Sequence, residues 1–317
     1  MKIRIIIKMN DMKYIYGPIP SRRLGLSLGI SPIPKKYCNY SCIYCQLGRT
    51  NHMVNKREMF YSVDEIISEL VITLSNNIKF DVVSIVGSGE PTLYKGIGEL
   101  INKIKKICNK PVVVITNGAL LDDKQVQEDL LNCDIILPTI DAYDENSFRL
   151  INRPHKKLVF QNIINGIIEF SNIFKGEIWL EIMFMENIND DQISLEEYKK
   201  LLKKIKYDKL YLNTPIRPPA EKGVNPVSHK KMEEIAKYLK GIPIDLPNSI
   251  GFHSEIKDDY LAVLRIIQRH PMNQFELESF LKTRKCIRID NIFEQLNIDK
   301  NIEVIEYKGY KTYRLKI

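Results

Sequence analysis

Short apolar runs alternate with longer amphipathic stretches from about Leu24 to Ile244. The apolar runs are rich in Val and Ile and nearly continuous, which is typical of strands buried on both faces of a parallel sheet. We predict six such strands, at residues 26–31, 81–87, 111–116, 134–140, 177–184 and 209–214.

Helices are predicted between these strands, at residues 62–76, 96–108, 123–131, 158–174, 193–205 and 228–239. Ser62 shows a clear start signal, because it can cap a helix and Glu65 follows three positions later. Strands that alternate with helices imply right-handed βαβ units. Six units predict an α/β fold, either a doubly wound sheet or a partial barrel.

The pattern changes after Ile250. Three helices are predicted at residues 258–270, 273–281 and 285–296, and a tail at 301–317 alternates around Lys308-Gly309, a hairpin turn signal. This order is typical of a winged helix. We therefore predict three parts: an N-terminal extension with a short strand at residues 2–9, a core, and a winged-helix-like domain after a linker near 247–255, with bounds 1–23, 24–250 and 251–317.

Composition is that of a soluble globular protein, with 317 residues, 44% of them apolar and 27% charged. No run approaches the roughly 18 apolar residues of a membrane span, and the opening residues lack a signal-peptide pattern. We therefore predict a cytoplasmic protein with no membrane partner. The net charge of +8 fits a polyanionic partner such as RNA, and it fits equally a lysine-rich composition of solvated helix faces.

Three cysteines, Cys38, Cys42 and Cys45, lie in one short loop that follows the first predicted strand. Thiolates are soft ligands that suit iron–sulfur clusters and zinc. Three of them can ligate three irons of a cubane and leave the fourth iron open to a chelating ligand. The loop would sit at the carboxyl end of the sheet, where ligands bind in α/β folds. A structural zinc site of the three cysteines and His52 is the alternative.

The cysteine spacing, with Tyr44 before the last cysteine, resembles the signature of the radical S-adenosylmethionine (SAM) superfamily. The resemblance covers about residues 24–244. It implies a partial (β/α)6 barrel with one [4Fe–4S] cluster, and SAM that chelates the open iron through its amino and carboxylate groups, with Tyr44 near the adenine. It also implies cleavage of SAM to methionine and a 5′-deoxyadenosyl radical, supported by an electron donor such as ferredoxin or flavodoxin.

The second predicted strand ends in a glycine-rich loop, formed by Gly87, Ser88, Gly89 and Glu90. Glycines let the backbone approach a ligand closely. The loop is similar to the superfamily's motif whose backbone and acidic group receive the SAM ammonium. A plain strand-to-helix turn is the alternative.

Polar residues end the next two strands, and the resemblance assigns Thr139 and Asp141 to the SAM ribose and carboxylate, with Asn117 as a further candidate. Asp141 could equally cap the helix that starts near Asp144.

Further candidates lie on strands five and six. Glu181 is a carboxylate in an apolar strand, so it must be paired or face a polar cavity, where it could contact SAM or substrate. Asn213 ends strand six at the same mouth, and the next loop could form a wall of the substrate site through Arg217 and Glu221. Arg22 and Arg23 either bind an anion or tie the N-terminus to the barrel.

The segments 16–34 and 212–221 resemble a radical SAM subgroup related to the archaeal wybutosine-synthesis enzyme, which modifies tRNA. That enzyme uses a second cluster, and no second cysteine set with suitable spacing occurs here, since Cys108, Cys133 and Cys286 stand alone. RNA, above all tRNA, is the first substrate expectation, and a protein or small molecule is the second. In another class, the chain could be a cluster-based redox or iron sensor that binds nucleic acid, but a sensor needs no SAM contacts.

The C-terminal part carries basic residues that could contact phosphates, on its third helix and wing: Arg284, Lys285, Arg288, Lys308 and Lys311. Acidic residues of the same part largely offset them. Winged helices also serve as protein-binding or lid modules, so nucleic-acid binding by this part stays open.

Overall fold

The computed structural model describes residues 13–244, 252–254 and 256–316. The predicted strand at residues 2–9 and most of the predicted linker at 247–255 lie outside the described residues.

The main sheet has eight strands in the order β1-β2-β5-β6-β7-β8-β9-β10. All neighbours pair in parallel except β1, which runs antiparallel to β2. The six predicted strands are confirmed as the parallel run from β2 to β9. The strands span Ile15–Ser21 (β1), Gly25–Ile30 (β2), Val82–Ile85 (β5), Val112–Thr116 (β6), Ile135–Pro138 (β7), Glu177–Met183 (β8), Lys209–Asn213 (β9) and Ile242–Pro243 (β10).

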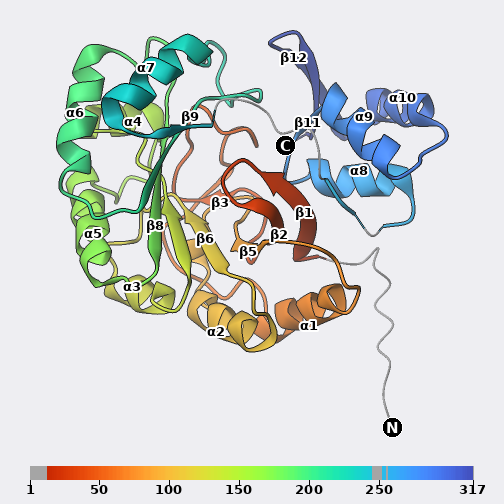
Figure 1. The fold of residues 1–317 in the computed structure, drawn as a ribbon, viewed down its shortest axis with the longest axis horizontal. Coiled ribbons are helices and arrows are strands. Elements are labelled where there is room, and N and C mark those ends of the chain that lie inside the picture. Colours follow the sequence, from red (N-terminus) through yellow and green to blue (C-terminus); the bar gives the residue numbers. More distant parts are fainter. Residues whose placement is uncertain (1–12, 245–251, 255, 317) are drawn as a thin grey trace.

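Helices connect these strands and cover the outer side of the curved sheet (Figure 1). The six predicted helices are confirmed, and a further short helix, α4, precedes α5. The helices span Val63–Leu74 (α1), Ile97–Ile107 (α2), Lys124–Leu130 (α3), Glu145–Ile151 (α4), Phe160–Ile173 (α5), Gln192–Leu202 (α6) and His229–Leu239 (α7).

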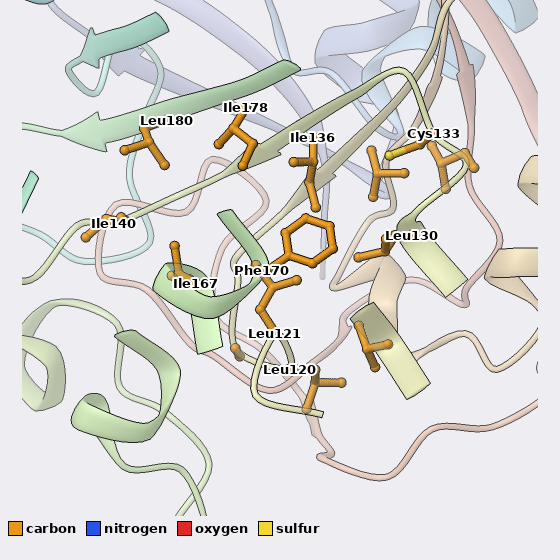
Figure 2. Packing of buried hydrophobic residues seen from close by; sticks show 14 of the residues in the cluster. Leu120, Leu121, Leu130, Cys133, Ile136, Ile140, Ile167, Phe170, Ile178 and Leu180 are labelled. Atoms are coloured by element: carbon orange, nitrogen blue, oxygen red, sulfur yellow. The ribbon is translucent and has the colours of Figure 1, made fainter. Parts of the chain in front are cut away.

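The main core lies between the sheet and these helices. Figure 2 shows Phe170 of α5 pointing toward Ile136 of β7, with Ile178 of β8 nearby. All three side chains are buried. Burying a side chain of this size stabilises the fold by about 2–3 kcal/mol, so the helices are held mainly by their apolar faces.

Two edge strands were not predicted. β1 lies within the predicted N-terminal extension, yet it pairs with β2 and extends the main sheet. Its sequence contains Gly17, Pro18 and Pro20, which hide a strand pattern because proline cannot donate to a ladder and is confined to edges. β10 has only two residues, too few to show a periodicity.

The cysteine loop carries a small sheet of its own. The strands Tyr37–Cys38 (β3) and His52–Met53 (β4) pair in parallel and close the base of the loop. A 3-10 turn at Pro91–Leu93 follows the glycine-rich loop after β5.

The C-terminal region, residues 256–316, contains three helices and a three-stranded antiparallel sheet of order β11-β13-β12. The turn at Lys308 and Gly309 has positive φ at both residues, 54° and 74°, as the hairpin prediction requires. Elements span Asp259–Ile267 (α8), Met272–Asn273 (β11), Gln274–Thr283 (α9), Ile289–Ile298 (α10), Ile302–Tyr307 (β12) and Tyr310–Leu315 (β13).

The third C-terminal helix begins later than predicted, at Ile289 instead of residue 285. Lys285 has a left-handed φ of 58°, which ends the preceding helix, and Arg288 is the N-cap of α10. The apolar residues between them therefore belong to the connection.

The C-terminal region packs against β1 and against the loop after β9, beside the sheet (Figure 1). Ile19 of β1 belongs to the apolar core of this region, and Tyr307 donates to the carbonyl of Pro215 at 2.7 Å. In the described part of the chain, no helix is both long enough and apolar enough to cross a membrane.

Candidate active site at the carboxyl end of the sheet

The three cysteines of the cluster loop, residues 36–53, line one cavity of about 390 Å³. Cys38 ends β3, and Cys42 and Cys45 lie in the turn that follows, where the amide of Cys45 donates to the carbonyl of Cys42 at 3.1 Å. All three are free thiols and partly exposed. Tyr44 lines the same cavity. The loop therefore presents its cysteines together, as the sequence predicted.

One side of the cluster loop is fixed to the glycine-rich loop after β5. The amide of Lys36 donates to the carbonyl of Ser88 at 2.7 Å, and the amide of Glu90 donates to the carbonyl of Tyr37 at 3.0 Å. A Cβ on Gly89 would lie 1.8 Å from the carbonyl oxygen of Tyr37, a distance that no side chain can accept. Gly89 is thus required for the contact between two backbone segments of the protein.

The other side of the cluster loop is fixed to the end of α4. The amide of Ile43 donates to the carbonyl of Ile151 at 2.9 Å, and the amide of Ser41 donates to the carbonyl of Asn152 at 2.9 Å. These bonds hold the loop between two βα connections. Sequence reasoning missed this contact, because nothing in the residues around α4 signals a partner about 110 positions earlier in the chain.

Two amide side chains donate to cysteine sulfurs. The Nδ2 of Asn152 lies 3.5 Å from the Sγ of Cys42, and the Nδ2 of Asn117 lies 3.8 Å from the Sγ of Cys38. Hydrogen bonds to cluster sulfurs are one of the means by which proteins set reduction potential. Asn117 was predicted as a SAM contact, and the structure places it against a cysteine instead of on the cavity wall.

The donor set fits a cubane cluster better than a single zinc ion. Among the described residues, no three His, Cys, Asp or Glu side chains could hold one metal ion together. His52, the fourth ligand of the zinc alternative, is exposed and stacks on Tyr37 with ring centroids 4.4 Å apart. A cubane binds each thiolate through a different iron, so its cysteines need not meet at one point.

Burial raises the pKa of Cys38 to about 12 and the pKa of Cys42 well above its usual value, with nearby carboxylates adding to both effects. Bound iron supplies the positive charge that makes thiolates stable in such surroundings.

The predicted SAM contacts divide into two groups. Six of them line the cavity with the cysteines: Tyr44, Gly87, Ser88, Gly89, Glu181 and Asn213. The other four, Glu90, Asn117, Thr139 and Asp141, lie outside the lining. Direct contact of SAM with any of these ten residues stays a prediction.

Glu90 joins the ends of two strands. Its Oε1 accepts from the amide of Thr92 at 2.9 Å and the hydroxyl of Thr116 at 2.6 Å, and its Oε2 accepts from the amide of Asn117 at 2.8 Å. Burial raises the pKa of Glu90, and these hydrogen bonds oppose that rise. In this arrangement the carboxylate orders the loops after β5 and β6.

Asp141 has a similar role behind Tyr44. It accepts the phenol of Tyr44, the Nδ2 of Asn152 at 3.0 Å and the amide of Met183 at 2.9 Å. Burial raises the pKa of Asp141 to about 6, and the hydrogen bonds oppose that rise. The alternative that Asp141 caps the next helix is wrong.

The cap of α4 is Asp144, which forms reciprocal hydrogen bonds with Ser147. Thr139 forms a parallel bridge with Glu181, and its Oγ1 lies 3.5 Å from the carbonyl oxygen of Thr116.

Glu181 is paired and also lines the cavity. It therefore meets both of the conditions under which an apolar strand can carry a carboxylate. It forms an ion pair with Arg23 and accepts the Nδ2 of Asn213 at 2.8 Å. Arg22 donates to the Oδ1 of Asn213 at 3.0 Å and to the carbonyl of Ile244. The two arginines therefore tie the N-terminal segment to the sheet, which was one of the two alternatives expected for them.

The charged residues Arg217 and Glu221 of the loop after β9 lie in different surroundings. Arg217 lines the cavity, whereas Glu221 is absent from the lining and forms ion pairs with Arg49 and Arg153. The expectation that this loop forms a wall of the substrate site stays a prediction, and the loop contributes Pro215, Ile216 and Arg217 to the cavity lining. Two further lining residues, Arg269 and His270, come from the C-terminal region and were missed, because sequence reasoning could not place the end of α8.

Comparison with known proteins identifies the family. Residues 33–202, more than half of the chain, match the family described as the radical SAM superfamily. The chain belongs to the radical SAM superfamily. It is therefore an enzyme, and its cofactors are those of the superfamily, a [4Fe–4S] cluster and SAM. The interpretation as a redox or iron sensor has no such support.

Relatives of similar length carry no assigned activity in their names. The chain is 36% identical over 320 residues to the UPF0026 protein of Methanocaldococcus jannaschii, covering 96% of this chain and 97% of that protein. It is also 30% identical over 297 residues to a UPF0026 protein of Helicobacter pylori, covering 92% and 96%. A protein of Brachyspira hyodysenteriae named GTPase Obg is 43% identical over 239 residues, but this chain spans only 35% of its length.

Solved structures share the fold at low identity. TYW1 with a lysine-pyruvate adduct bound aligns with a TM-score of 0.55 and 20% identity, covering 68% of this chain and 74% of that chain. A radical SAM methyltransferase from Sphaerobacter thermophilus aligns with a TM-score of 0.54 and 15% identity, covering 68% and 65%. These two likenesses concern the fold alone.

Proposed function

We propose that this enzyme cleaves SAM reductively and directs the resulting radical at a substrate held between the main sheet and the C-terminal region. One observation carries the proposal: the three cysteines, Tyr44 and the glycine-rich loop line the same cavity as Arg269 and His270 of the C-terminal region. A substrate in this cavity would lie within reach of the cofactors.

The cofactors and the residues of the chain have separate roles in the proposed reaction. When bound, the reduced cluster supplies one electron to the sulfonium of SAM, whose C5′–S bond breaks to give methionine and a 5′-deoxyadenosyl radical. Cys38, Cys42 and Cys45 would hold the cluster, while Asn117 and Asn152 donate to two of their sulfurs. The wall of the cavity would limit the access of water and stray hydrogen donors to the radical.

The test is anaerobic. The chain is reconstituted with iron and sulfide, reduced with dithionite and supplied with SAM, and 5′-deoxyadenosine and methionine are measured. We expect both products in equal amounts. No 5′-deoxyadenosine, with the cluster present by iron and sulfide content, would refute the proposal. A ferredoxin or flavodoxin is the physiological electron donor that we propose in place of dithionite.

For the substrate, we propose RNA first, and tRNA above all. The net charge of +8 and the resemblance of residues 16–34 and 212–221 to a tRNA-modifying subgroup support this choice. A binding measurement with purified tRNA over a range of salt concentrations tests it, because binding through phosphates must weaken steeply as salt rises. A small molecule is the second candidate, favoured by the modest cavity of about 390 Å³.

We propose three structural parts, residues 1–23, 24–250 and 251–317, and a winged-helix module as the last. The order of helix, short strand, two helices and hairpin supports this assignment. Arg284 is engaged within the module, in an ion pair with Asp259 and in hydrogen bonds to two backbone carbonyls at 2.7 Å and 2.5 Å. Because these contacts hold Arg284, the module is better suited to closing the cavity than to presenting Arg284 to a nucleic acid.

A further inference from the structure

Arginines supply most of the charged groups that line the cavity. Four of them, from three separate segments, are among the described lining residues: Arg22, Arg23, Arg217 and Arg269. Glu181 is the one carboxylate among those described lining residues. We call these four residues the arginine wall. Such a surplus of cationic groups in a partly closed cavity attracts an anion.

Two guanidinium groups of the arginine wall have an unsatisfied donor. The Nε atoms of Arg23 and Arg269 are buried and have no hydrogen-bond partner, and no other side-chain N or O atom of the described residues is in this state. A buried donor without a partner costs about 1–3 kcal/mol, so its presence needs an explanation. Both arginines are among the residues that line the cavity.

The wall also spans the junction between the main sheet and the C-terminal region. The Nη2 of Arg217, from the loop after β9, lies 2.7 Å from the Nε2 of His270 and 2.9 Å from the Oε1 of Glu276. Burial and the charges of Arg217 and Arg22 lower the pKa of His270 well below its usual value, so the imidazole is neutral. Burial, with Arg22 nearby, likewise lowers the pKa of Arg23 to about 10. Burial is the main cause of both shifts, and neighbouring arginines add to it.

We propose that the arginine wall binds a phosphate group of the substrate, and that the C-terminal region completes this site with Arg269 and His270. This inference rests on the proposed function, because it places the phosphate in the cavity that the cysteines line. Several guanidinium groups from different directions suit a phosphate, which carries one negative charge as a diester of RNA and close to two as a monoester. A single carboxylate needs fewer donors, as Glu181 shows with one contact to Arg23 and one to Asn213.

Inorganic phosphate is the first probe. Binding to the cluster-loaded full chain is measured by calorimetry at constant ionic strength, with acetate as the matched anion. We expect saturable binding of phosphate that is at least tenfold tighter than that of acetate. Phosphate that binds no better than acetate would overturn the inference.

Variants locate the site. Arg269→Gln and Arg22→Gln should each weaken phosphate binding at least tenfold, and Arg269→Lys, which keeps the charge, should weaken it less. Arg149→Gln is the control, because Arg149 is exposed and pairs with Glu145 on the surface of α4, outside the cavity lining. Far-ultraviolet circular dichroism and iron content report folding, and either Gln variant suffices if the other misfolds. Unchanged phosphate affinity in a folded Gln variant would overturn the inference.

The source of the phosphate is distinguished by two larger probes, ribose 5-phosphate and unfractionated tRNA. Competition of ribose 5-phosphate with inorganic phosphate supports a small phosphate ester, and displacement of tRNA by inorganic phosphate supports an RNA phosphate.

The failure of the arginine-wall inference can be told apart from the failure of the proposed function. If the wild-type chain forms 5′-deoxyadenosine but does not bind phosphate, only the arginine-wall inference fails; if it binds phosphate but forms no 5′-deoxyadenosine, the proposed function fails.

Discussion

At the scale of single residues, the site depends on a few polar side chains that hold others in place. Asn152 donates both to the sulfur of Cys42 and to Asp141, and Asp141 in turn accepts the phenol of Tyr44. A cluster ligand and a cavity-lining ring are thereby coupled through two buried side chains. The orientation of Tyr44 is fixed from behind the wall.

Replacing Cys42 with Ala should abolish stable cluster binding, because two cysteines cannot hold a cubane whose fourth iron is left open for SAM. Iron and acid-labile sulfide after reconstitution should fall to a small fraction of the wild-type content. Cys108→Ala is the matched control, since Cys108 lies at the end of α2, outside the cavity lining. Unchanged iron in Cys42→Ala would contradict the ligand assignment.

His270 should make the protein less stable in mild acid. The pKa of His270 is lowered in the folded state by burial and by Arg217 and Arg22, so the unfolded chain takes up a proton below about pH 6.5 and the folded chain does not. The free energy of unfolding therefore falls as pH decreases below that value, by up to about 1.4 kcal/mol per pH unit.

Urea unfolding of the wild type and His270→Gln at pH 7.5 and pH 5.5 checks this prediction. The difference between the two pH values should be smaller in the variant, which has no imidazole to protonate. Equal differences would show that His270 is not held neutral.

At the scale of elements, the site is made by connections that dock on one another. The cluster loop lies between the loop after β5 and the end of α4 and bonds to both through its backbone. Backbone contacts of this kind leave little room for side chains, which explains why Gly89 is needed where it approaches Tyr37. The glycine at position 89 is therefore explained by contact between loops.

Gly89→Ala should lower the free energy of unfolding by about 3 kcal/mol and reduce cluster incorporation, because its Cβ would collide with the carbonyl of Tyr37, 1.8 Å away. Urea unfolding and iron content measure the two effects. Gly223→Ala is the control: its Cβ meets no atom within 4 Å, and its φ of 85° costs an alanine about 1 kcal/mol. Similar losses in both variants would contradict a specific contact at Gly89.

At the scale of the whole molecule, the C-terminal region is fastened to the main sheet by polar contacts at several points. Arg217 pairs with Glu276, Tyr307 donates to Pro215, and Arg265 donates to the carbonyl of Ile15 at 3.0 Å. The first contact is nearly dry, since only 11% of the Arg217 side chain and 2% of the Glu276 side chain are exposed. Breaking one partner of such a pair leaves a buried charge.

Arg217→Met should therefore lower the free energy of unfolding by about 3–4 kcal/mol, because it leaves Glu276 buried without its cation. Adding Glu276→Gln to the same chain should recover part of the loss, since the amide can keep the helix cap with Asn273. Urea unfolding of the two variants and the wild type measures this. Arg149→Met, at an exposed pair, should cost less than about 1 kcal/mol, and an equal loss there would contradict the buried role of Arg217.

The sequence determined the elements and the cysteine chemistry. Buried parallel strands show themselves as continuous apolar runs, so β2 and β5 to β9 were predictable, and the spacing of Cys38, Cys42 and Cys45 predicted one cluster loop at the carboxyl end of the sheet. Edge strands such as β1 carry no such pattern, because an edge tolerates proline and needs no alternation.

Tertiary structure alone decided which polar residues face the cavity. Glu90 and Asp141 follow strands just as Ser88 and Asn213 do, yet they turn into the wall and hold loops together. It also decided that Arg269 and His270, far along the chain, share the cavity with Cys38. The reason is physical: strand periodicity fixes which face a residue takes within its own element, whereas contacts between connections depend on how loops and the C-terminal region pack, and no local pattern records that packing.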